Sequence, residues 1–218
     1  MKWNRRWVLP AVFVGVAALT RWPGLFPPNF SAFYALAFCA GAFFRGQVAW
    51  WVPLGTLLAT DLVLNCYYQY WLGYEAFQWY QLLNYAGFAV LIGLGRCFRS
   101  HRGLLPLLGG GLLGACLFYV LTNTASWLFN PFGHPEYTKD LAGWLVALTK
   151  GTAGFPPTWE FFRNTMLSGG LFTALFAWVH RWAPSPETEA ARDPEPEGEE
   201  AEGTPKGRPS AKPAPAEA

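Results

Sequence analysis

The sequence predicts an all-α membrane protein with six transmembrane helices, both termini in the cytoplasm, a short amphipathic helix in the last outer loop and a disordered C-terminal tail. Composition supports this class. Apolar residues make up 52% of the 218 positions and aromatic residues 18%, whereas the first 182 positions hold only five of the 14 acids. A soluble domain carries far more charge. We therefore expect one transmembrane domain over 1–182.

The remaining segment, 183–218, has a different composition. It holds nine of the 14 acids and eight of the 18 prolines, and it is rich in Ala and Gly. Such a segment cannot bury enough apolar surface to offset the loss of chain entropy on folding. We expect a solvated, disordered cytoplasmic tail rather than an interaction module.

Six apolar runs are candidates for the membrane spans. A span needs roughly 20 apolar residues, and Trp and Tyr favour its borders. The runs are Trp7–Trp22, Phe30–Phe44, Val48–Tyr67, Trp79–Phe98, Leu104–Phe129 and Trp159–Trp182. Basic residues ahead of the first run also suit a signal peptide, but no A-x-A cleavage site follows it. We interpret it as a span.

Basic residues give the orientation. With the N-terminus in the cytoplasm, eight Lys and Arg lie on the inner side and four on the outer side of the body, as the positive-inside rule expects. The last outer loop, 130–158, contains "TKDLAGWLVALTK", whose apolar residues have helical spacing after a Thr138 cap. Twelve residues make roughly 18 Å of helix, too little to cross. A crossing here would give seven spans and an outer tail.

Four spans each place one strongly polar side chain in the outer third of the membrane. At about 1.5 Å per residue they lie roughly 8–9 Å below the aromatic border. They are Asp61, Asn84, Asn123 and Asn164, with Trp127 and Arg163 nearby. An ionisable residue inside a membrane indicates a functional site by default, which predicts an outward-facing pocket. The alternative is structural: Asn bonding between helices, and an Asp61–Arg163 ion pair.

No motif of an enzyme is present. The sequence has no Ser-His-Asp set, no H-E-x-x-H, no phosphate loop and no dinucleotide fingerprint, so we expect no catalytic residue, no metal and no cofactor. Small residues do crowd several spans, including Gly41 in "ALAFCAGA", and let helices approach closely. Ala11, Gly15 and Ala18 form a similar surface on the first span that suits another protein.

Four stretches carry a resemblance: "PPNFSAFYALAFCAGAFF", "ATDLVLN", "LTNTASWL" and "FFRNTMLSGGLFTALFAW". They resemble an uncharacterised family of bacterial multi-pass membrane proteins, itself distantly similar to the substrate-binding S components of energy-coupling-factor transporters. The resemblance covers roughly residues 7–180. The matching positions are Pro28, Asn29, Asp61, Thr122, Asn123, Trp127, Arg163, Asn164 and Thr165. The chain departs from the family pattern at Gly170, where an acid is expected, and near Ala32, where a Pro is expected.

The resemblance implies a substrate-capture subunit of the bacterial cytoplasmic membrane that binds a small nutrient such as a vitamin. It also implies a scaffold subunit docking at the first helix and an ATPase pair, since the chain has no nucleotide-binding domain. The candidate ligand-binding residues are Asp61, Asn84, Asn123, Trp127, Arg163 and Asn164. The alternative function is a non-transporting membrane scaffold, in which these polar residues are structural.

Overall fold

The computed structural model describes residues 8–99 and 103–182, and this part of the chain is all-helical. Seven α-helices follow one another, and a π-helical turn, η2 (Tyr67–Trp71), extends the third of them. Their bounds are α1 Val8–Thr20, α2 Phe33–Phe43, α3 Val48–Cys66, α4 Gln81–Cys97, α5 Leu104–Phe129, α6 Leu141–Leu148 and α7 Thr158–Trp182. The predicted tail and the basic residues Lys2, Arg5, Arg6 and Arg102 lie outside the described residues.

The all-helical fold is confirmed, and each of the six predicted apolar runs coincides with one helix to within a few residues. Within residues 8–99 and 103–182, two helical segments are long and apolar enough to cross a membrane, Val48–Trp71 and Leu104–Phe129. α1 and α2 are shorter, with 13 and 11 residues. At 1.5 Å per residue, α2 measures only about 16 Å.

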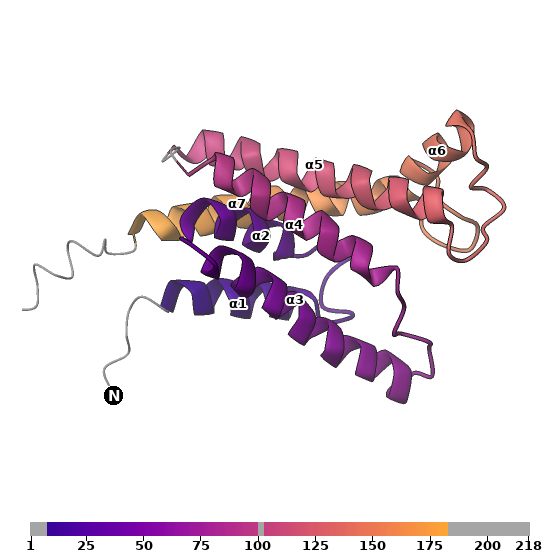
Figure 1. Cartoon of the computed structure of the whole chain (residues 1–218), viewed down its shortest axis with the longest axis horizontal. Helices are drawn as coiled ribbons and strands as arrows, with labels where there is room; N and C mark the ends of the chain where they lie inside the picture. The colour runs from indigo at the N-terminus through magenta and orange to yellow at the C-terminus, as the bar shows by residue number, and fades with distance from the viewer. Residues whose placement is uncertain (1–7, 100–102, 183–218) are drawn as a thin grey trace, which may run out of the picture. The chain divides into compact units, whose positions relative to one another are not determined.

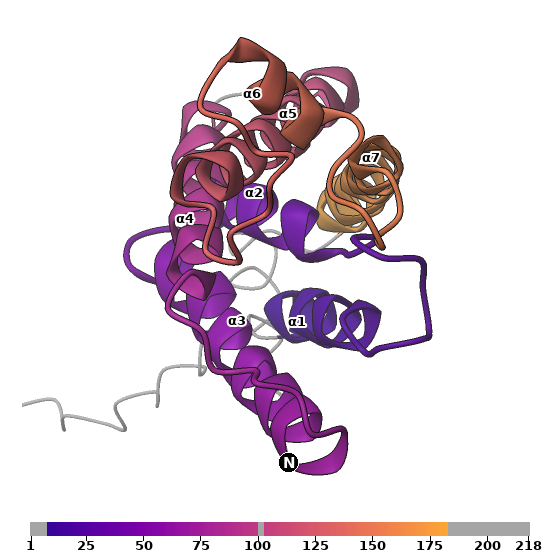
Figure 2. The same cartoon turned by 90° about the vertical axis from the view of Figure 1, so that its right-hand side faces the viewer.

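α2 is the central helix of the bundle. It packs against α1, α3, α4, α5 and α7, and every residue from Phe33 to Ala42 is buried. Viewed end-on, α2 lies in the middle, with α4, α5 and α7 around it and α1 and α3 towards one side (Figure 2). The small side chains of this segment explain its position, because they let neighbouring helices approach from all sides.

Helices α2 and α4 cross in close contact at two glycines. A Cβ added to Gly41 would stand 2.2 Å from the Ile92 carbonyl oxygen, and one added to Gly95 would stand 2.0 Å from that of Phe38. Both distances are shorter than any real contact, so the backbones of the two helices touch directly. The close approach expected at Gly41 is confirmed, and Gly95 is its counterpart on α4.

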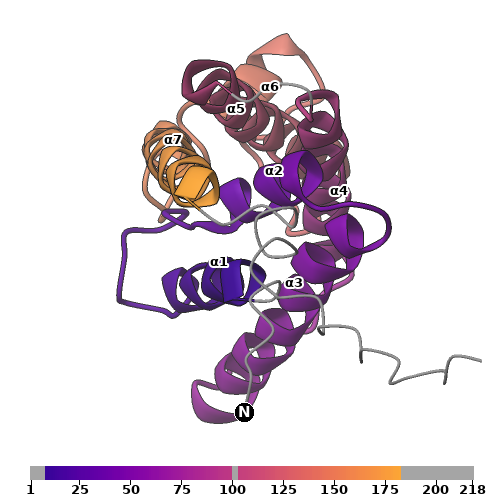
Figure 3. The ribbon, with the colours of Figure 1, turned by 90° about the vertical axis from the view of Figure 1, so that its left-hand side faces the viewer.

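The helices alternate in direction along the bundle. α1 begins and α7 ends at the same end, where α2 and α4 also end and α3 and α5 begin (Figure 1). Figure 3 looks at this end, and Figure 2 at the opposite one, which carries α6 and the longer loops. At the end shown in Figure 3, Arg99 holds the end of α2 in place. Its guanidinium donates hydrogen bonds to the carbonyl oxygens of Gly41 (3.0 Å) and Phe44 (2.6 Å).

The short helix expected in the last loop is α6, but its cap is not Thr138. The N-cap is Asp140, whose carboxylate accepts a hydrogen bond from the Gly143 backbone N–H at 2.8 Å. Thr138 instead donates its hydroxyl to Asp140 at 2.7 Å. The prediction was wrong by two residues because a Thr hydroxyl and an Asp carboxylate both suit this position, and the carboxylate is the stronger acceptor for a helix N-terminus.

Candidate functional site

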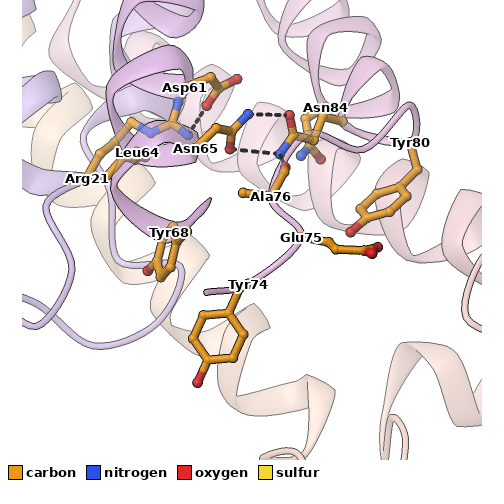
Figure 4. A pocket seen from close by; sticks show the side chains of 11 residues that line it. Arg21, Asp61, Leu64, Asn65, Tyr68, Tyr74, Glu75, Ala76, Tyr80 and Asn84 are labelled. Atoms are coloured by element: carbon orange, nitrogen blue, oxygen red, sulfur yellow. Dashed lines mark hydrogen bonds and ion pairs between the residues drawn. The ribbon is translucent and has the colours of Figure 1, made fainter. Parts of the chain in front are cut away.

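A polar cavity of about 310 Å³ lies where the end of α3, the start of α4 and their connecting loop meet (Figure 4). It is at the end of the bundle that carries the longer loops. Charged, amide and phenol side chains converge on it. The lining residues are Arg21, Asp61, Leu64, Asn65, Tyr68, Tyr74, Glu75, Ala76, Tyr80, Gln81 and Asn84.

An ion pair forms one side of the cavity. Arg21 directly follows α1, and its guanidinium donates a hydrogen bond to the Asp61 carboxylate on α3. The guanidinium also lies over the Phe33 ring, 5.2 Å from its centre. Both charged side chains are mostly buried, with 22% and 15% of their surface exposed. The pairing therefore neutralises a carboxylate that would otherwise be costly to bury.

Two side-chain amides form the next part of the wall. Asn65 donates to the Gln81 Oε1 at 2.9 Å, and Gln81 returns a bond to the Asn65 Oδ1 at 3.1 Å. The Gln81 amide also donates to the carbonyl oxygen of Ala76 at 2.8 Å. The Gln69 Oε1 accepts from the Ala76 N–H at 3.0 Å. These bonds fix the α3–α4 loop against both helices, so the cavity has a defined shape.

The loop supplies the outer wall, with three tyrosines and an acid. The rings of Tyr68 and Tyr74 lie 6.5 Å apart, and the Tyr74 backbone N–H donates to the Tyr68 carbonyl oxygen at 3.0 Å. Glu75 and Tyr80 lie across the cavity from Arg21 (Figure 4). With Arg21 and Asp61 paired, Glu75 gives the outer wall a negative charge beside aromatic rings. Such a wall is suited to a cationic group.

The structure brings two of the predicted site residues together. Asp61 and Asn84 come from α3 and α4 and line this same cavity. Both were expected at similar depth in their spans.

The other polar residues on the predicted list bond elsewhere. Asn123 donates its side-chain amide to the Tyr119 carbonyl oxygen of its own helix, at 2.9 Å. Trp127 donates its indole N–H to the Thr138 carbonyl oxygen at 2.6 Å, which holds the start of the α6 segment against α5. Neither residue lines the cavity at Asp61.

Asn164 and Arg163 lie at the start of α7, also away from the cavity. Asn164 donates to the Pro28 carbonyl oxygen at 2.9 Å and so ties α7 to the α1–α2 loop. The Arg163 Nε donates to the Asn164 Oδ1 at 3.4 Å, and its guanidinium lies 5.4 Å from the centre of the Trp159 ring. The alternative Asp61–Arg163 ion pair is therefore wrong. Asp61 pairs with Arg21 because α1 packs beside α3, whereas α7 packs on α2, α5 and α6.

A family model described as a family of unknown function (DUF6580) matches residues 1–191. The chain belongs to this family, DUF6580. No curated protein and no solved structure matches this DUF6580 chain. Its resemblance to transporter S components accordingly remains a prediction.

Sequence reasoning missed several cavity residues of this DUF6580 protein. Arg21 was counted only as an outer basic residue, although it lies at the outer end of the first apolar run and Asp61 lies near the outer end of the third. Gln81 gave no signal, because its role depends on Asn65, sixteen positions earlier. Tyr68, Tyr74 and Tyr80 sit in the aromatic loop, which an interfacial belt also explains.

Titratable side chains do not gather elsewhere in a way that suggests metal chemistry. Over residues 8–99 and 103–182, no three His, Cys, Asp or Glu side chains lie close enough to hold a metal ion. All four cysteines are free thiols, and Cys39 is buried. The arrangement at Asp61 thus offers hydrogen-bonding and charged groups for binding.

Proposed function

We propose that this protein is a multi-pass protein of the bacterial cytoplasmic membrane that captures a small polar molecule in the cavity at Asp61. The observation that carries the proposal is the convergence of an ion pair, paired amides and three tyrosines on one cavity at a single end of the bundle. Ligand sites combine few polar groups, precisely placed by the fold, with a concave surface.

Exposed apolar surface supports the membrane location. Only 22% of the most apolar stretch of Val48–Trp71 is buried, which favours a lipid-facing segment over the core helix of a soluble protein. Many large apolar side chains on this segment and on other helices are exposed, among them Leu19, Trp51, Leu58, Val63, Leu82, Leu105, Leu113, Leu121, Leu167 and Leu171. Water-soluble monomers rarely expose so much contiguous apolar surface, whereas lipid tails cover it without cost.

The order of the helices supports six crossings with both termini in the cytoplasm. The start of α1 and the end of α7 share one end of the bundle with Arg45, Arg96 and Arg99 (Figure 1). Positive residues favour the cytoplasmic side. The cavity at Asp61 then opens to the outside. The short α2 fits this arrangement, because its neighbours surround it and it needs no lipid-facing surface of its own.

Uptake would follow the pattern of transporter S components, which the sequence resembles. In that case a scaffold subunit and an ATPase pair supply the energy. Ala11 and Gly15 are exposed on α1, and a Cβ added to Gly15 would meet no atom within 4 Å. We place the scaffold contact on this open face of α1, at Ala11 and Gly15, because Ala18 lines the groove between α1 and α3.

Native mass spectrometry of the protein purified in mild detergent tests the proposal. We expect a stoichiometric small molecule to co-purify with the wild type and to be lost from the Asp61→Asn variant. Asp140→Asn is the matched control, because it makes the same chemical change in the outer loop, away from the cavity. A ligand retained equally in all three proteins contradicts the assignment of the site.

A non-transporting scaffold is the second candidate, and one observation favours it. Asn65 and Gln81 satisfy each other, and Arg21 neutralises Asp61, so the polar groups already have partners within the protein. For this function we expect no co-purifying ligand and a lower thermal stability of Asp61→Asn. The presence or absence of a co-purifying ligand therefore distinguishes the two candidate functions.

A further inference from the structure

A second cavity adjoins the polar one. It is an apolar groove of about 660 Å³ between α1 and α3. Its walls include Ala18, Trp22, Trp51, Gly55, Ala59 and Val63. Arg21 and Leu64 line both cavities, so the groove continues into the polar cavity at the Arg21–Asp61 pair.

The groove is mostly apolar along its length. Its two hydroxyl groups are already bonded to their own helix: Thr56 donates to the Val52 carbonyl oxygen at 2.6 Å, and Thr60 to the Thr56 carbonyl oxygen at 2.9 Å. Gly55 and Ala59 are small residues, so the α3 wall leaves space in the groove. A Cβ added to Gly55 would meet no atom within 4 Å. A hydrocarbon chain can pack against such an apolar surface without needing a hydrogen-bond partner.

Charges follow a definite order from the groove outward. The Arg21 guanidinium lies at the junction of the two cavities, and Arg carries five N–H donors, more than Asp61 alone uses. Beyond it comes Asn65, whose amide is hydrogen-bonded to that of Gln81, and then Tyr80 and Glu75 lie on the far side (Figure 4). A bound molecule therefore meets the apolar wall, the guanidinium of the Arg21–Asp61 ion pair, the amides, and finally aromatic rings with a negative charge.

We propose that the ligand of this site is a zwitterionic single-chain amphiphile, with its tail in the α1–α3 groove, its anionic group at Arg21 and its cationic group at Glu75 and the tyrosines. Arg binds phosphate and carboxylate groups through several N–H donors at once. A quaternary ammonium group is suited to tyrosine rings beside a carboxylate. This inference rests on the proposed function and specifies the class of molecule that the cavity captures.

Binding to the full-length protein in an amphipathic polymer, free of detergent, tests the inference. The probe is dodecylphosphocholine below its micelle concentration. Three controls each lack one part: phosphocholine has no tail, dodecyl phosphate has no cation, and dodecyl maltoside has no charge. We expect dodecylphosphocholine to bind at least about tenfold more tightly than each control, the ratio expected for one well-formed contact.

Variants separate the tail site from the head site. Gly55→Leu and Ala59→Leu fill the groove and should each weaken dodecylphosphocholine binding by about tenfold. Gly109→Leu is the matched control, because Gly109 is also exposed on a helix with no atom within 4 Å of an added Cβ, and lies in neither cavity. Glu75→Gln should remove the preference for dodecylphosphocholine over dodecyl phosphate.

Three outcomes overturn the inference. If phosphocholine binds as tightly as dodecylphosphocholine and the groove variants change nothing, the ligand has no tail, while the proposed capture function stands. If dodecyl maltoside binds equally well, the groove takes any bilayer lipid without selection of a head group. If Gly109→Leu weakens binding as much as Gly55→Leu, the loss is not specific to the groove. Failure of the capture function itself is a different result: no small molecule binds or co-purifies at all.

Discussion

Arg21 and Asp61 form an ion pair between residues forty positions apart in the chain, joining the end of α1 to the middle of α3. This contact explains how a carboxylate is kept within a long apolar segment. It also sets the junction between the polar cavity and the apolar groove, since Arg21 lines both. The same pair therefore has a structural role and a position at the candidate site.

The pair should contribute measurably to stability. We expect Arg21→Gln and Asp61→Asn each to lower the free energy of unfolding by about 1–3 kcal/mol, because each leaves the other charge without its partner. The double variant should lose about 1 kcal/mol less free energy of unfolding than the sum of the losses in the two single variants. Measuring the unfolding of the wild type, the two single variants and the double variant in the same detergent gives this coupling. Strict additivity would show that the two side chains do not interact.

The α2–α4 crossing should tolerate no added methyl group. Gly95→Ala would place its Cβ 2.0 Å from the Phe38 carbonyl oxygen, and we expect a loss of about 1–3 kcal/mol as the helices separate. Gly93→Ala on the same helix is the control, because no atom lies within 4 Å of its added Cβ. There the gain in helix propensity should stabilise the protein by up to about 1 kcal/mol. Equal thermal shifts in the two variants would contradict the close crossing.

The cap of α6 should make this helix sensitive to acid. The backbone N–H of Gly143 and the Thr138 hydroxyl hold the pKa of the Asp140 carboxyl below its ordinary value. A carboxyl whose pKa is lower in the folded state stabilises that state at neutral pH, and this stabilisation is lost as the pH falls through the lowered pKa. We expect hydrogen-exchange protection of α6, corrected for intrinsic rates, to fall in acid.

The Asp140→Asn variant is the control for this prediction. Asn is also a good N-cap but does not titrate, so the acid-dependent loss of protection should disappear while the helix persists. An unchanged pH profile in the variant would assign the effect to another group.

Two native cysteines should report the orientation. Cys66 and Cys97 are both exposed, at the ends of α3 and α4, which lie at opposite ends of the bundle. With both termini in the cytoplasm, a membrane-impermeant maleimide added to intact cells should label a variant retaining only Cys66, and should label one retaining only Cys97 after permeabilisation. Labelling of Cys97 in intact cells would contradict the proposed topology.

Much of the secondary structure was predictable from the sequence. Apolar runs, their aromatic borders and their breaks at Gly and Pro are local properties, so they located the helices to within a few residues. The prediction was weaker where two residues compete for one local role, as Thr138 and Asp140 do at the start of α6.

The site was predictable only in part. Asp61 was identified because a carboxylate in an apolar run is a local anomaly, and Asn84 because it lies at a similar depth. Asn123 has the same chemistry and depth, yet it bonds to its own helix. Sequence spacing gives the depth of a side chain but not the direction in which its helix faces, so it does not distinguish a cavity residue from a packing residue.

By itself, therefore, the sequence determined an all-helical chain with an apolar body, a charged tail and a carboxylate that needs a partner. Only the tertiary structure decided that the partner is Arg21 and not Arg163, that α2 is the central helix, and that a polar cavity and an apolar groove meet at Arg21 and Leu64. Each of these depends on which helices pack side by side. That choice is made by the fit of small and large side chains between segments far apart in the chain, which a local pattern does not contain.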